Sequence, residues 1–525
     1  MMAATPASNS RHRIAAVALV ILIALVLLAT RSLQSDFTGN PDEPSHVVSS
    51  LMVRDYVVDA FPGNPLTYAE NYYMHYPKVA IVHWPPLFYC GEAGFMLVFG
   101  RNRTALLIFS AGILTLLVLS LFFWMRRECG LLPAFVAASL FVTSIHMVRM
   151  LSVVGPDGLM TLFLFWSVVN WGLFLETPRW RYLGLSLLFT VCAVGSHYRA
   201  ILLILVFPIA VALARGGSLR HRRFFFVASI VLSVALLPML AYVPHWLSQA
   251  YPFSWASLVD TVTAVAKTML HSLGLPLILL AIVGIPLALR GRPRWSAMMA
   301  LLFGGLLFLA SVNVPFIERY MFGSMLPVIA AAAMGFAYLW RLLRRPIFQG
   351  ALLTVLAAFI AYSLFNVERK HDRGYHRLVA APALPGSDSL VYLSAGDPID
   401  EGAFVSEMAL QSAHPLHFVV RAGKVLAHSS WNGDGFRLLF DTPEAIRDQL
   451  NLMHVGFVVV EETSRKPEVP LLTQALRTAP TVWAQLTAPE APIGVSVFRR
   501  IGPMPTGPME IEVHTSMGQH LHIRQ

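Results

Sequence analysis

Residues that could do chemistry together are few in this chain, and they gather beside the ends of long apolar segments. The acidic ones are the adjacent pair Asp42-Glu43, together with Asp157 and Glu318. Cationic side chains occur in the same stretches of sequence: Arg54, Lys78, His83, Arg149, Arg199 and Arg319. A carboxylate can take a proton from a hydroxyl or hold a metal ion, whereas Arg and Lys bind anionic groups such as phosphate. The set therefore suits a site that holds a phosphate and removes a proton.

Two other interpretations of these residues stay open. Charged side chains at the end of a membrane helix often only mark where that helix meets water. In addition, Glu43 and His46 are candidate ligands for a divalent metal ion, because carboxylate oxygens and imidazole nitrogens are common metal ligands. Asp42 and Glu43 are adjacent and begin a long loop, so they are the strongest candidates for a catalytic role.

The composition predicts a polytopic membrane protein. The chain has 525 residues, of which 56% are apolar and only 13% charged, and its mean hydropathy is +0.62. A soluble chain carries about 25% charged residues, so this one has too few to coat a water-facing surface. Collagen-like, disordered and disulfide-scaffold proteins are excluded by the same numbers. The three cysteines are scattered and form no CxxC or Cys/His metal pattern.

Apolar runs long enough to cross about 30 Å of hydrocarbon predict about eleven transmembrane helices. They lie at 14–30, 103–124, 131–148, 158–175, 183–197, 200–214, 224–243, 268–289, 296–312, 320–340 and 347–365. The first run is expected to be an uncleaved signal anchor, because its flank LLATRSLQSD lacks an Ala-x-Ala site. Residues 85–100 contain Glu92 and three glycines, which predicts a re-entrant or interfacial segment.

Charge predicts the orientation of these helices and a boundary after Val367. Residues 1–367 carry a net charge of +13 and residues 368–525 a net charge of −3, which together give +10. Sixteen of the 25 cations in the first part fall before the first run or in alternate short loops, whereas ten of its twelve acids fall on the other side. The positive-inside rule therefore places the N-terminus in the cytoplasm and residues 368–525 outside. The high pI reflects topology and predicts no nucleic-acid partner.

The working face is expected outside, because the long loops are there. The first outer loop runs from Arg31 to about His83, and its stretch VVSSLMVRDYVVDA predicts a helix lying in the interface. A second long outer loop is expected from Tyr242 to about Lys267. No P-loop and no GxGxxG after a strand occurs. No acid lies in the middle of a run, which argues against an ion-coupled transporter.

Residues 1–367 resemble the C-type (GT-C) membrane glycosyltransferases, in the group of the protein O-mannosyltransferases and lipid A aminoarabinose transferases. The resemblance rests on the order and sidedness of four motifs: NPDEPSHV (40–47), HWPPLFY (83–89), Arg149 with Pro156-Asp157, and ERYMFGSMLP (318–327). The C-terminal part resembles the exported domain of bacterial relatives of this group in two segments, EGAFVSE (401–407) and RAGKVLAHSSW (421–431). One departure is that Trp84 stands where the aminoarabinose transferases have a Lys before Pro-Pro.

The resemblance implies an inverting glycosyltransferase in the inner (cytoplasmic) membrane, whose donor is a sugar on a polyprenyl phosphate and whose acceptor is a lipid, glycan or protein. It implies that Asp42 acts as the base or orients the acceptor, and that Glu43 and Asp157 are the further acidic residues. Members differ in their need for a divalent metal ion, so metal use stays open. The candidates for binding the donor phosphate or substrate are Lys78, His83, Arg149, Arg319, Tyr320 and Arg54.

The residues are consistent with that chemistry on their own. A phosphate leaving group departs without a strong general acid, so the site needs one carboxylate base and cations on the phosphate. Glycosidases differ, because they need two carboxylates at a set separation. The alternative function is a lipid or glycan transporter or flippase with an exported accessory domain. That function predicts polar residues along a midplane path and inverted repeats, and neither is evident in the sequence.

Residues 368–525 predict a soluble α/β domain of the outer side, large enough for its own core. Strand-like runs such as SLVYLSAG and VGFVVVEE alternate with helix-like runs such as TPEAIRDQLNLMH and VPLLTQALRTA. Five residues of this domain could form a site or could be ordinary loop and cap residues: Asp397, Glu401, Glu407, His414 and His417. We expect the domain to cover the transferase site or to bind the acceptor.

Overall fold

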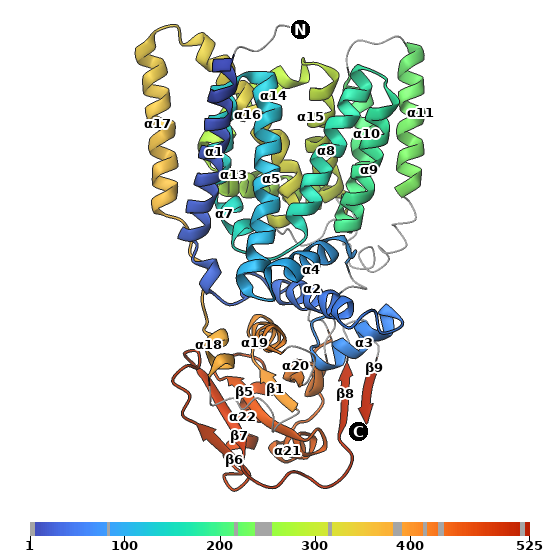
Figure 1. Cartoon of the computed structure of the whole chain (residues 1–525), viewed down its shortest axis with the longest axis vertical. Coiled ribbons are helices and arrows are strands. Elements are labelled where there is room, and N and C mark those ends of the chain that lie inside the picture. The colour runs from blue at the N-terminus through green and yellow to red at the C-terminus, as the bar shows by residue number, and fades with distance from the viewer. Residues whose placement is uncertain are drawn as a thin grey trace. The chain divides into compact units, whose positions relative to one another are not determined.

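The structure is a computed structural model that describes residues 6–80, 84–214, 219–236, 255–312, 318–381, 391–412, 417–428, 435–514 and 520–524 (Figure 1). The chain divides into two compact units. Unit 1 comprises Met1–Arg31, Trp84–Phe88 and Ile108–Arg369, and unit 2 comprises Ser32–His83, Tyr89–Leu107 and Lys370–Gln525.

Unit 1 is built from α-helices, which run side by side in Figure 1. They are α1 (Pro6–Ala29), most of α5 (Arg103–Cys129), α6 (Leu131–Val142), α7 (Ile145–Leu151), α8 (Asp157–Glu176), α9 (Trp180–Ser196), α10 (Leu203–Leu213), α11 (Leu219–Leu236), α13 (Trp255–Leu273), α14 (Leu275–Leu289), α15 (Pro293–Val312), α16 (Phe322–Leu342) and α17 (Pro346–Phe365). Two short 3-10 helices precede α10 and α16, namely η2 (Tyr198–Leu202) and η4 (Glu318–Met321).

Each of the eleven predicted apolar runs contains a helix. Among the described residues, six helices are long and apolar enough to cross a membrane, or up to eight if each of two bent pairs is one crossing. The predicted runs 183–197 and 200–214 correspond to shorter apolar helices, Trp180–Ser196 and Tyr198–Leu213. The prediction of a mostly helical membrane protein is therefore confirmed, while eleven crossings remain a prediction.

Two predicted runs are broken in the structure. Run 131–148 bends by 65° between α6 and α7, where the Ser144 hydroxyl accepts a hydrogen bond from the Met147 amide and starts a new helix. Run 268–289 spans the junction of α13 and α14, which bends by 119°. Gly274 has φ +81° there and Pro276 opens α14, a combination that a continuous helix does not tolerate.

The predicted second outer loop is wrong at its C-terminal end, where the structure has a helix. The predicted loop from Tyr242 to Lys267 contains the first part of α13, which begins at Trp255. Sequence reasoning missed this helix because Thr261, Thr263 and Lys267 interrupt its apolar pattern. Residues 237–254 lie outside the described residues.

Helices α14 and α16 pack closely through small residues. A Cβ atom at Gly284 would overlap the Ala331 carbonyl oxygen, and one at Gly335 would overlap the Leu280 carbonyl oxygen. Small residues let helix backbones approach in a membrane, where packing replaces the hydrophobic effect as the driving force. This contact fixes α16, and η4 directly before it carries Glu318, Arg319 and Tyr320.

Unit 2 contains the first outer loop and the C-terminal residues. The loop forms η1 (Ser32–Gln34), α2 (Glu43–Val58) and α3 (Pro65–His75), and α4 (Leu87–Phe99) follows it. Helix α2 coincides with the predicted interfacial helix, and α4 coincides with the segment 85–100. Residues 43–52 of α2 are all buried.

The C-terminal residues of unit 2 form a mixed sheet covered by helices, as Figure 1 shows. The strands are β1 (Val391–Ala395), β2 (Phe418–Arg421), β5 (Val455–Glu461), β6 (Trp483–Leu486) and β7 (Val495–Arg500), in the order β2-β1-β5-β7-β6. β2, β1 and β5 are parallel, whereas β7 and β6 add antiparallel strands. The helices are α18 (Tyr375–Ala380), α19 (Pro398–Gln411), α20 (Ala422–Val425), α21 (Pro443–Leu452) and α22 (Glu468–Arg477), and two small ladders, β3 (Ala427–His428) with β4 (Arg437–Leu438) and β8 (Glu510–His514) with β9 (His520–Arg524), complete the described elements.

The sheet order follows from the sequence pattern. β1 is buried throughout and β5 up to its last residue, as expected for parallel strands that helices cover on both faces. The predicted strand and helix runs of the C-terminal part thus correspond to observed elements.

Candidate active site

The N-terminus of α2 presents Asp42 without using its carboxylate as a cap. The side-chain oxygen of Asn40 accepts hydrogen bonds from the backbone amides of Asp42 and Glu43, both at 2.9 Å. Asp42 itself is half-buried and makes no side-chain cap hydrogen bond. The amides of the helix end are thus satisfied by Asn40 and not by the Asp42 carboxylate.

Glu43 is fixed on both carboxylate oxygens. Its Oε1 lies 2.7 Å from Nζ of Lys370, and its Oε2 accepts a hydrogen bond of 2.7 Å from the Gly39 amide. The side chains of Glu43 and Lys370 are 0% and 2% exposed. A buried charge of this kind is tolerated because it is paired and hydrogen-bonded. Glu43 is therefore anchored at both of its carboxylate oxygens.

Further along α2, two polar side chains face α4. Nδ1 of His46 lies 2.9 Å from the Tyr89 hydroxyl, and the Ser50 hydroxyl donates to Oε2 of Glu92 at 2.5 Å. Burial raises the pKa of Glu92 well above its ordinary value, so this acid is expected to be neutral. These contacts hold α2 against α4.

Lys78 is buried behind the same helix end. Its Nζ donates to the Pro41 carbonyl at 3.2 Å. Burial and the neighbouring Arg421 lower the pKa of Lys78 from 10.5 to about 7, against the opposite effects of Asp42 and Glu401. A Cβ atom at Gly402 of α19 would lie 3.1 Å from Nζ, so only glycine leaves the lysine its full space.

We expect the stability of the protein to depend on pH through Lys78. Between about pH 7 and pH 10.5 the unfolded chain holds a proton that folded Lys78 lacks, so the free energy of unfolding rises with pH across this window. Lys78→Met removes this contribution, whereas Lys424, whose pKa burial lowers to about 8, keeps a smaller one. At pH 7 the lowered pKa of Lys78 costs the folded protein a few kcal/mol of unfolding free energy, because each pKa unit corresponds to about 1.4 kcal/mol. Thermal unfolding in detergent between pH 7 and pH 10 measures the trend.

The matched control is Lys466→Met in the same unit, which keeps the wild-type slope. If Tm changed with pH in parallel for wild type and Lys78→Met, the lowered pKa of Lys78 would be contradicted. The Tm advantage of the Lys78→Met variant over wild type is expected to shrink as the pH rises. An advantage that grows with pH would contradict the direction of the shift.

The remaining predicted residues of the first outer loop have these positions. Arg54 pairs with Asp55 on the same helix at 2.6 Å. Asp55 is also bound by the Tyr72 hydroxyl at 3.0 Å, so Arg54 belongs to a network at the far end of α2 from Asp42. His83 lies outside the described residues.

A second polar cluster lies within unit 1, and Asp157 and Arg199 are at its centre. The Asp157 carboxylate at the start of α8 is ion-paired with Arg199 of η2, and both side chains are buried. The Arg199 guanidinium also donates to the Arg319 carbonyl at 3.3 Å and lies 4.3 Å from the ring centroid of Tyr320. The Arg319 guanidinium lies 5.6 Å from that ring. Asp157, Arg319 and Tyr320 are thus brought together through Arg199.

Glu318 joins the cluster to Arg149. Its Oε2 lies 2.7 Å from the Arg149 guanidinium and its Oε1 lies 3.4 Å from Nδ1 of His146. The Ser272 hydroxyl of α13 donates to the same carboxylate. Arg149 is half exposed and also pairs with Glu368 at 3.0 Å. Cations and hydrogen-bond donors from α7, α13, η2 and η4 therefore gather in one part of unit 1, as a site for an anionic group requires.

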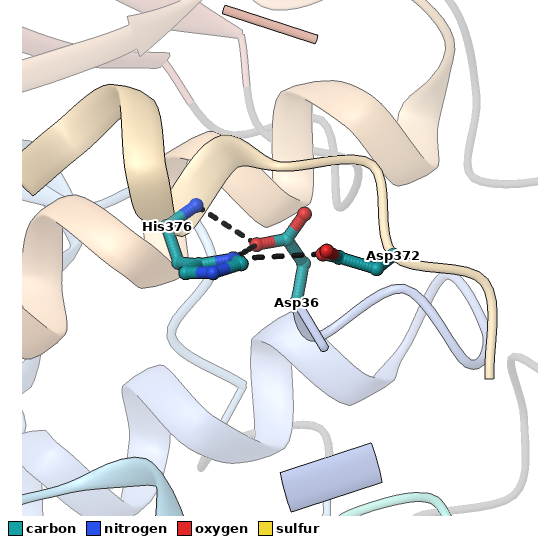
Figure 2. A group of neighbouring side chains, drawn as sticks. All are labelled: Asp36, Asp372 and His376. Atoms are coloured by element: carbon teal, nitrogen blue, oxygen red, sulfur yellow. Dashed lines mark hydrogen bonds and ion pairs between the residues drawn. The ribbon is translucent and has the colours of Figure 1, made fainter. Parts of the chain in front are cut away.

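Among the described residues, two groups of side chains in unit 2 have the composition of a metal site, and both already make contacts within the protein. In the first, ligand atoms of Asp36, Asp372 and His376 lie within 4.8 Å of one another (Figure 2). The Asp36 carboxylate already accepts hydrogen bonds from the backbone amides of residues 374–376 and faces Nδ1 of His376 at 2.7 Å. Asp372 accepts from the Gly374 amide at 3.2 Å.

The second group consists of Asp397, Asp400 and Glu461. The Arg373 guanidinium binds both aspartates, and Asp397 also caps α19 through the amides of residues 399 and 400. Every carboxylate of both groups accepts from a protein donor. The predicted metal candidates Glu43 and His46 are engaged in the same way, by Lys370 and Tyr89. In the described part of the chain, the metal candidates are therefore already held by protein partners, and the reaction proposed below is written without a metal ion.

The other charged residues singled out in the C-terminal part make structural contacts. Glu401 pairs with Arg421 at 2.9 Å, and Glu407 pairs with Arg103 at 2.5 Å. Burial raises the pKa of Glu407 to about 7 although Arg103 opposes the shift. His417 is buried against Tyr392, and His414 lies outside the described residues. Asp397 is a helix cap, which agrees with the alternative that these residues are ordinary loop and cap residues.

Sequence reasoning missed two residues at the α2 terminus, Asn40 and Lys370. Asn40 carried a local signal, because Asn two residues before an acidic helix start is a common cap. Lys370 carried none, because it lies 327 residues from its partner Glu43.

The comparisons with known proteins agree with this architecture. The sequence pattern of the family described as dolichyl-phosphate-mannose-protein mannosyltransferase matches residues 83–242. Among solved structures, the chain is similar to ArnT from Cupriavidus metallidurans bound to undecaprenyl phosphate, with 12% identity, a TM-score of 0.56, and coverage of 93% of this chain and 99% of that chain. ArnT in the apo state gives 13% identity, a TM-score of 0.55, and coverage of 93% and 98%.

A third similar structure is the oligosaccharyltransferase of Archaeoglobus fulgidus in complex with Zn and sulfate, with 12% identity, a TM-score of 0.51, and coverage of 90% of this chain and 72% of that chain. Comparison with curated proteins by sequence gives no match. The chain has the fold of ArnT and of the archaeal oligosaccharyltransferase, and residues 83–242 match the mannosyltransferase family pattern.

Proposed function

We propose that the protein is an inverting glycosyltransferase that moves a hexose or pentose from a polyprenyl-phosphate donor to an acceptor hydroxyl or phosphate. The observation that carries the proposal is the arrangement at α2: Asn40 caps the helix end and Lys370 anchors Glu43, so the half-buried Asp42 stands on a fixed helix turn. A carboxylate on a rigidly held helix turn suits a general base.

The proposed reaction with a hydroxyl acceptor is a single displacement. The acceptor oxygen attacks the anomeric carbon as Asp42 takes its proton, and the bond from that carbon to the phosphate oxygen breaks. The polyprenyl phosphate leaves with the electron pair, and the anomeric configuration inverts. Positive charge near the departing phosphate lowers the barrier, and the candidates for that role are the cations that the sequence predicts, among them Lys78, Arg149 and Arg319.

An apolar cavity supports the choice of a lipid-linked donor. It has a volume of about 250 Å³ and lies among α13, α14, α15 and α16. Its lining includes Met269, one turn before Ser272, which donates to Glu318. Polar groups for a phosphate and an apolar lining that suits prenyl units thus occur on the same helix. ArnT, which has this fold, was solved with undecaprenyl phosphate bound.

The proposal includes the cellular setting. We place the enzyme in the inner membrane, with about eleven crossings, the N-terminus inside, and transfer on the outer face, on the charge distribution of the loops. We also propose that residues 368–525 are an exported domain.

The proposal is tested by transfer in proteoliposomes and by the glycans of a deletion strain. Purified protein with a radiolabelled polyprenyl-phosphate sugar and an envelope extract should label a glycolipid or glycoprotein. Mass spectrometry of the deletion strain should show that a glycolipid or glycoprotein has lost one sugar. A strain that accumulates the lipid-linked precursor on the inner leaflet, together with purified protein that transfers no sugar, would instead favour a flippase.

A further inference from the structure

The loop that leads into α2 is bound along its length by one distant segment, residues 370–376, named here the clamp segment. Lys370 pairs with Glu43, and the His371 carbonyl accepts a hydrogen bond of 2.7 Å from the Thr38 hydroxyl. The amides of residues 374–376 donate to the Asp36 carboxylate at 2.6–2.9 Å. Figure 2 shows Asp36 beside His376 and Asp372. These contacts fix the loop at three points between Asp36 and Glu43.

The clamp segment also contributes the side chain of Lys370, which is enclosed by its neighbours. Nζ of Lys370 lies 5.8 Å from the ring centroid of Phe37, which also faces the Arg103 guanidinium at 5.3 Å. Phe37 and Glu43 are both fully buried, so Lys370 is enclosed by an aromatic face and a carboxylate. A lysine so placed has few alternative positions, and its ammonium holds Glu43 in one rotamer.

The other side of the helix end is held by α19. A Cβ atom at Gly402 would lie 3.0 Å from Cγ of Pro44, so α19 packs its backbone against the residue that follows Glu43. Asp42 thus stands on a helix turn that is capped by Asn40, packed against α19 and tied by Lys370. Asp42 is the half-buried member of this turn, while Glu43 is buried.

We propose that Lys370 is a positioning residue, and that the clamp segment sets the orientation of the Asp42 carboxylate by fixing Glu43. The proposal rests on the proposed function. Lys370 is not a catalytic residue, because it is buried and its ammonium is bound to Glu43. Its effect is on geometry, and a misplacement of about 1 Å can lower a rate by about 100-fold.

The first experiment separates positioning from substrate binding. In proteoliposomes, Lys370→Met is expected to lower kcat by about 100-fold with the KM for the donor changed by less than about threefold, and Lys370→Arg is expected to recover most of kcat because it keeps the charge. Lys466→Met, a lysine of the same unit outside the clamp segment, is the control and should leave kcat unchanged. Full kcat in Lys370→Met, or a change confined to KM, would overturn the proposal.

A second variant guards against loss of folding. Lys370→Met leaves Glu43 buried without its cation, whereas Glu43→Gln with Lys370→Gln replaces the ion pair by a neutral hydrogen-bonded pair. The double variant should fold and should have a higher kcat than Lys370→Gln alone. Equal kcat in the two folded variants would overturn the role of the pair.

Hydrogen exchange keeps this test distinct from the test of the proposed function. In Lys370→Met, the backbone amide hydrogens of residues 36–46 should exchange with solvent at least tenfold faster than in wild type, while those of β5 stay protected. If wild type transfers no sugar but exchange responds in this way, the proposed function fails and the clamp stands. If wild type transfers sugar and neither exchange nor kcat responds to Lys370→Met, the clamp fails and the proposed function stands.

Discussion

Asp42→Asn is expected to lower kcat/KM for sugar transfer by about 100- to 10,000-fold, the range that a positioned general base contributes. Asparagine has nearly the same shape, so the substitution removes the negative charge and the proton acceptor while leaving the side-chain volume. The Asn40 oxygen still caps α2 and Lys370 still anchors Glu43, so the fold should persist. Transfer in proteoliposomes measures the rate, and thermal unfolding in detergent verifies the fold.

A matched control for this variant lies at the other end of the same helix. Asp59 is the C-terminal cap residue of α2, and its carboxylate accepts a hydrogen bond of 2.9 Å from the Tyr68 hydroxyl. Asp59→Asn keeps an acceptor for Tyr68 and changes the net charge by the same amount, so transfer should stay within about twofold of wild type. Asp42→Asn protein that folds and keeps more than a tenth of the wild-type rate would remove Asp42 from the mechanism.

The local features of the site could be predicted from the sequence, because they depend on neighbouring residues. The helical spacing of apolar residues after Asp42 predicts α2, and the buried apolar runs around Tyr392 and Val458 predict β1 and β5. The break at Gly274 could have been predicted as well, since a Gly followed by Leu-Pro often ends one helix and starts another. The apolar run across it is long enough to conceal that signal.

The long-range contacts could not be predicted. The pair of Lys370 with Glu43 and the hydrogen bonds from the clamp segment to Asp36 join positions more than 300 residues apart. Hydrophobic periodicity predicts which face of an element is buried, but it does not say which charged residue lies opposite. Arg199 illustrates the same limit. The sequence identifies it as a cation at the outer ends of the helices, but its pairing with Asp157 and its contact with Tyr320 follow only from packing.

Asp157→Asn is expected to have the second largest effect, on stability and on donor binding together. The side chains of Asp157 and Arg199 are 7% and 6% exposed, and removal of one partner of a buried ion pair costs about 3–5 kcal/mol because the other charge stays buried. The carboxylate also sets the direction of a guanidinium that contacts Arg319 and Tyr320. Asp157→Asn should therefore lower the Tm and raise the KM for the polyprenyl-phosphate donor.

The control for Asp157→Asn is another ion pair of unit 1, Glu128 with Arg294 at 2.7 Å. Arg294 also pairs with Glu176 at 3.1 Å, so Glu128→Gln leaves it a partner and should cost less stability, with no change in the KM for the donor. An Asp157→Asn variant that is as stable as wild type would contradict the buried pair. A stable variant that loses kcat at an unchanged donor KM would assign Asp157 to the reacting atoms themselves, as the resemblance to the GT-C enzymes implies. The donor KM therefore decides whether the carboxylate acts through Arg199 or on the substrate.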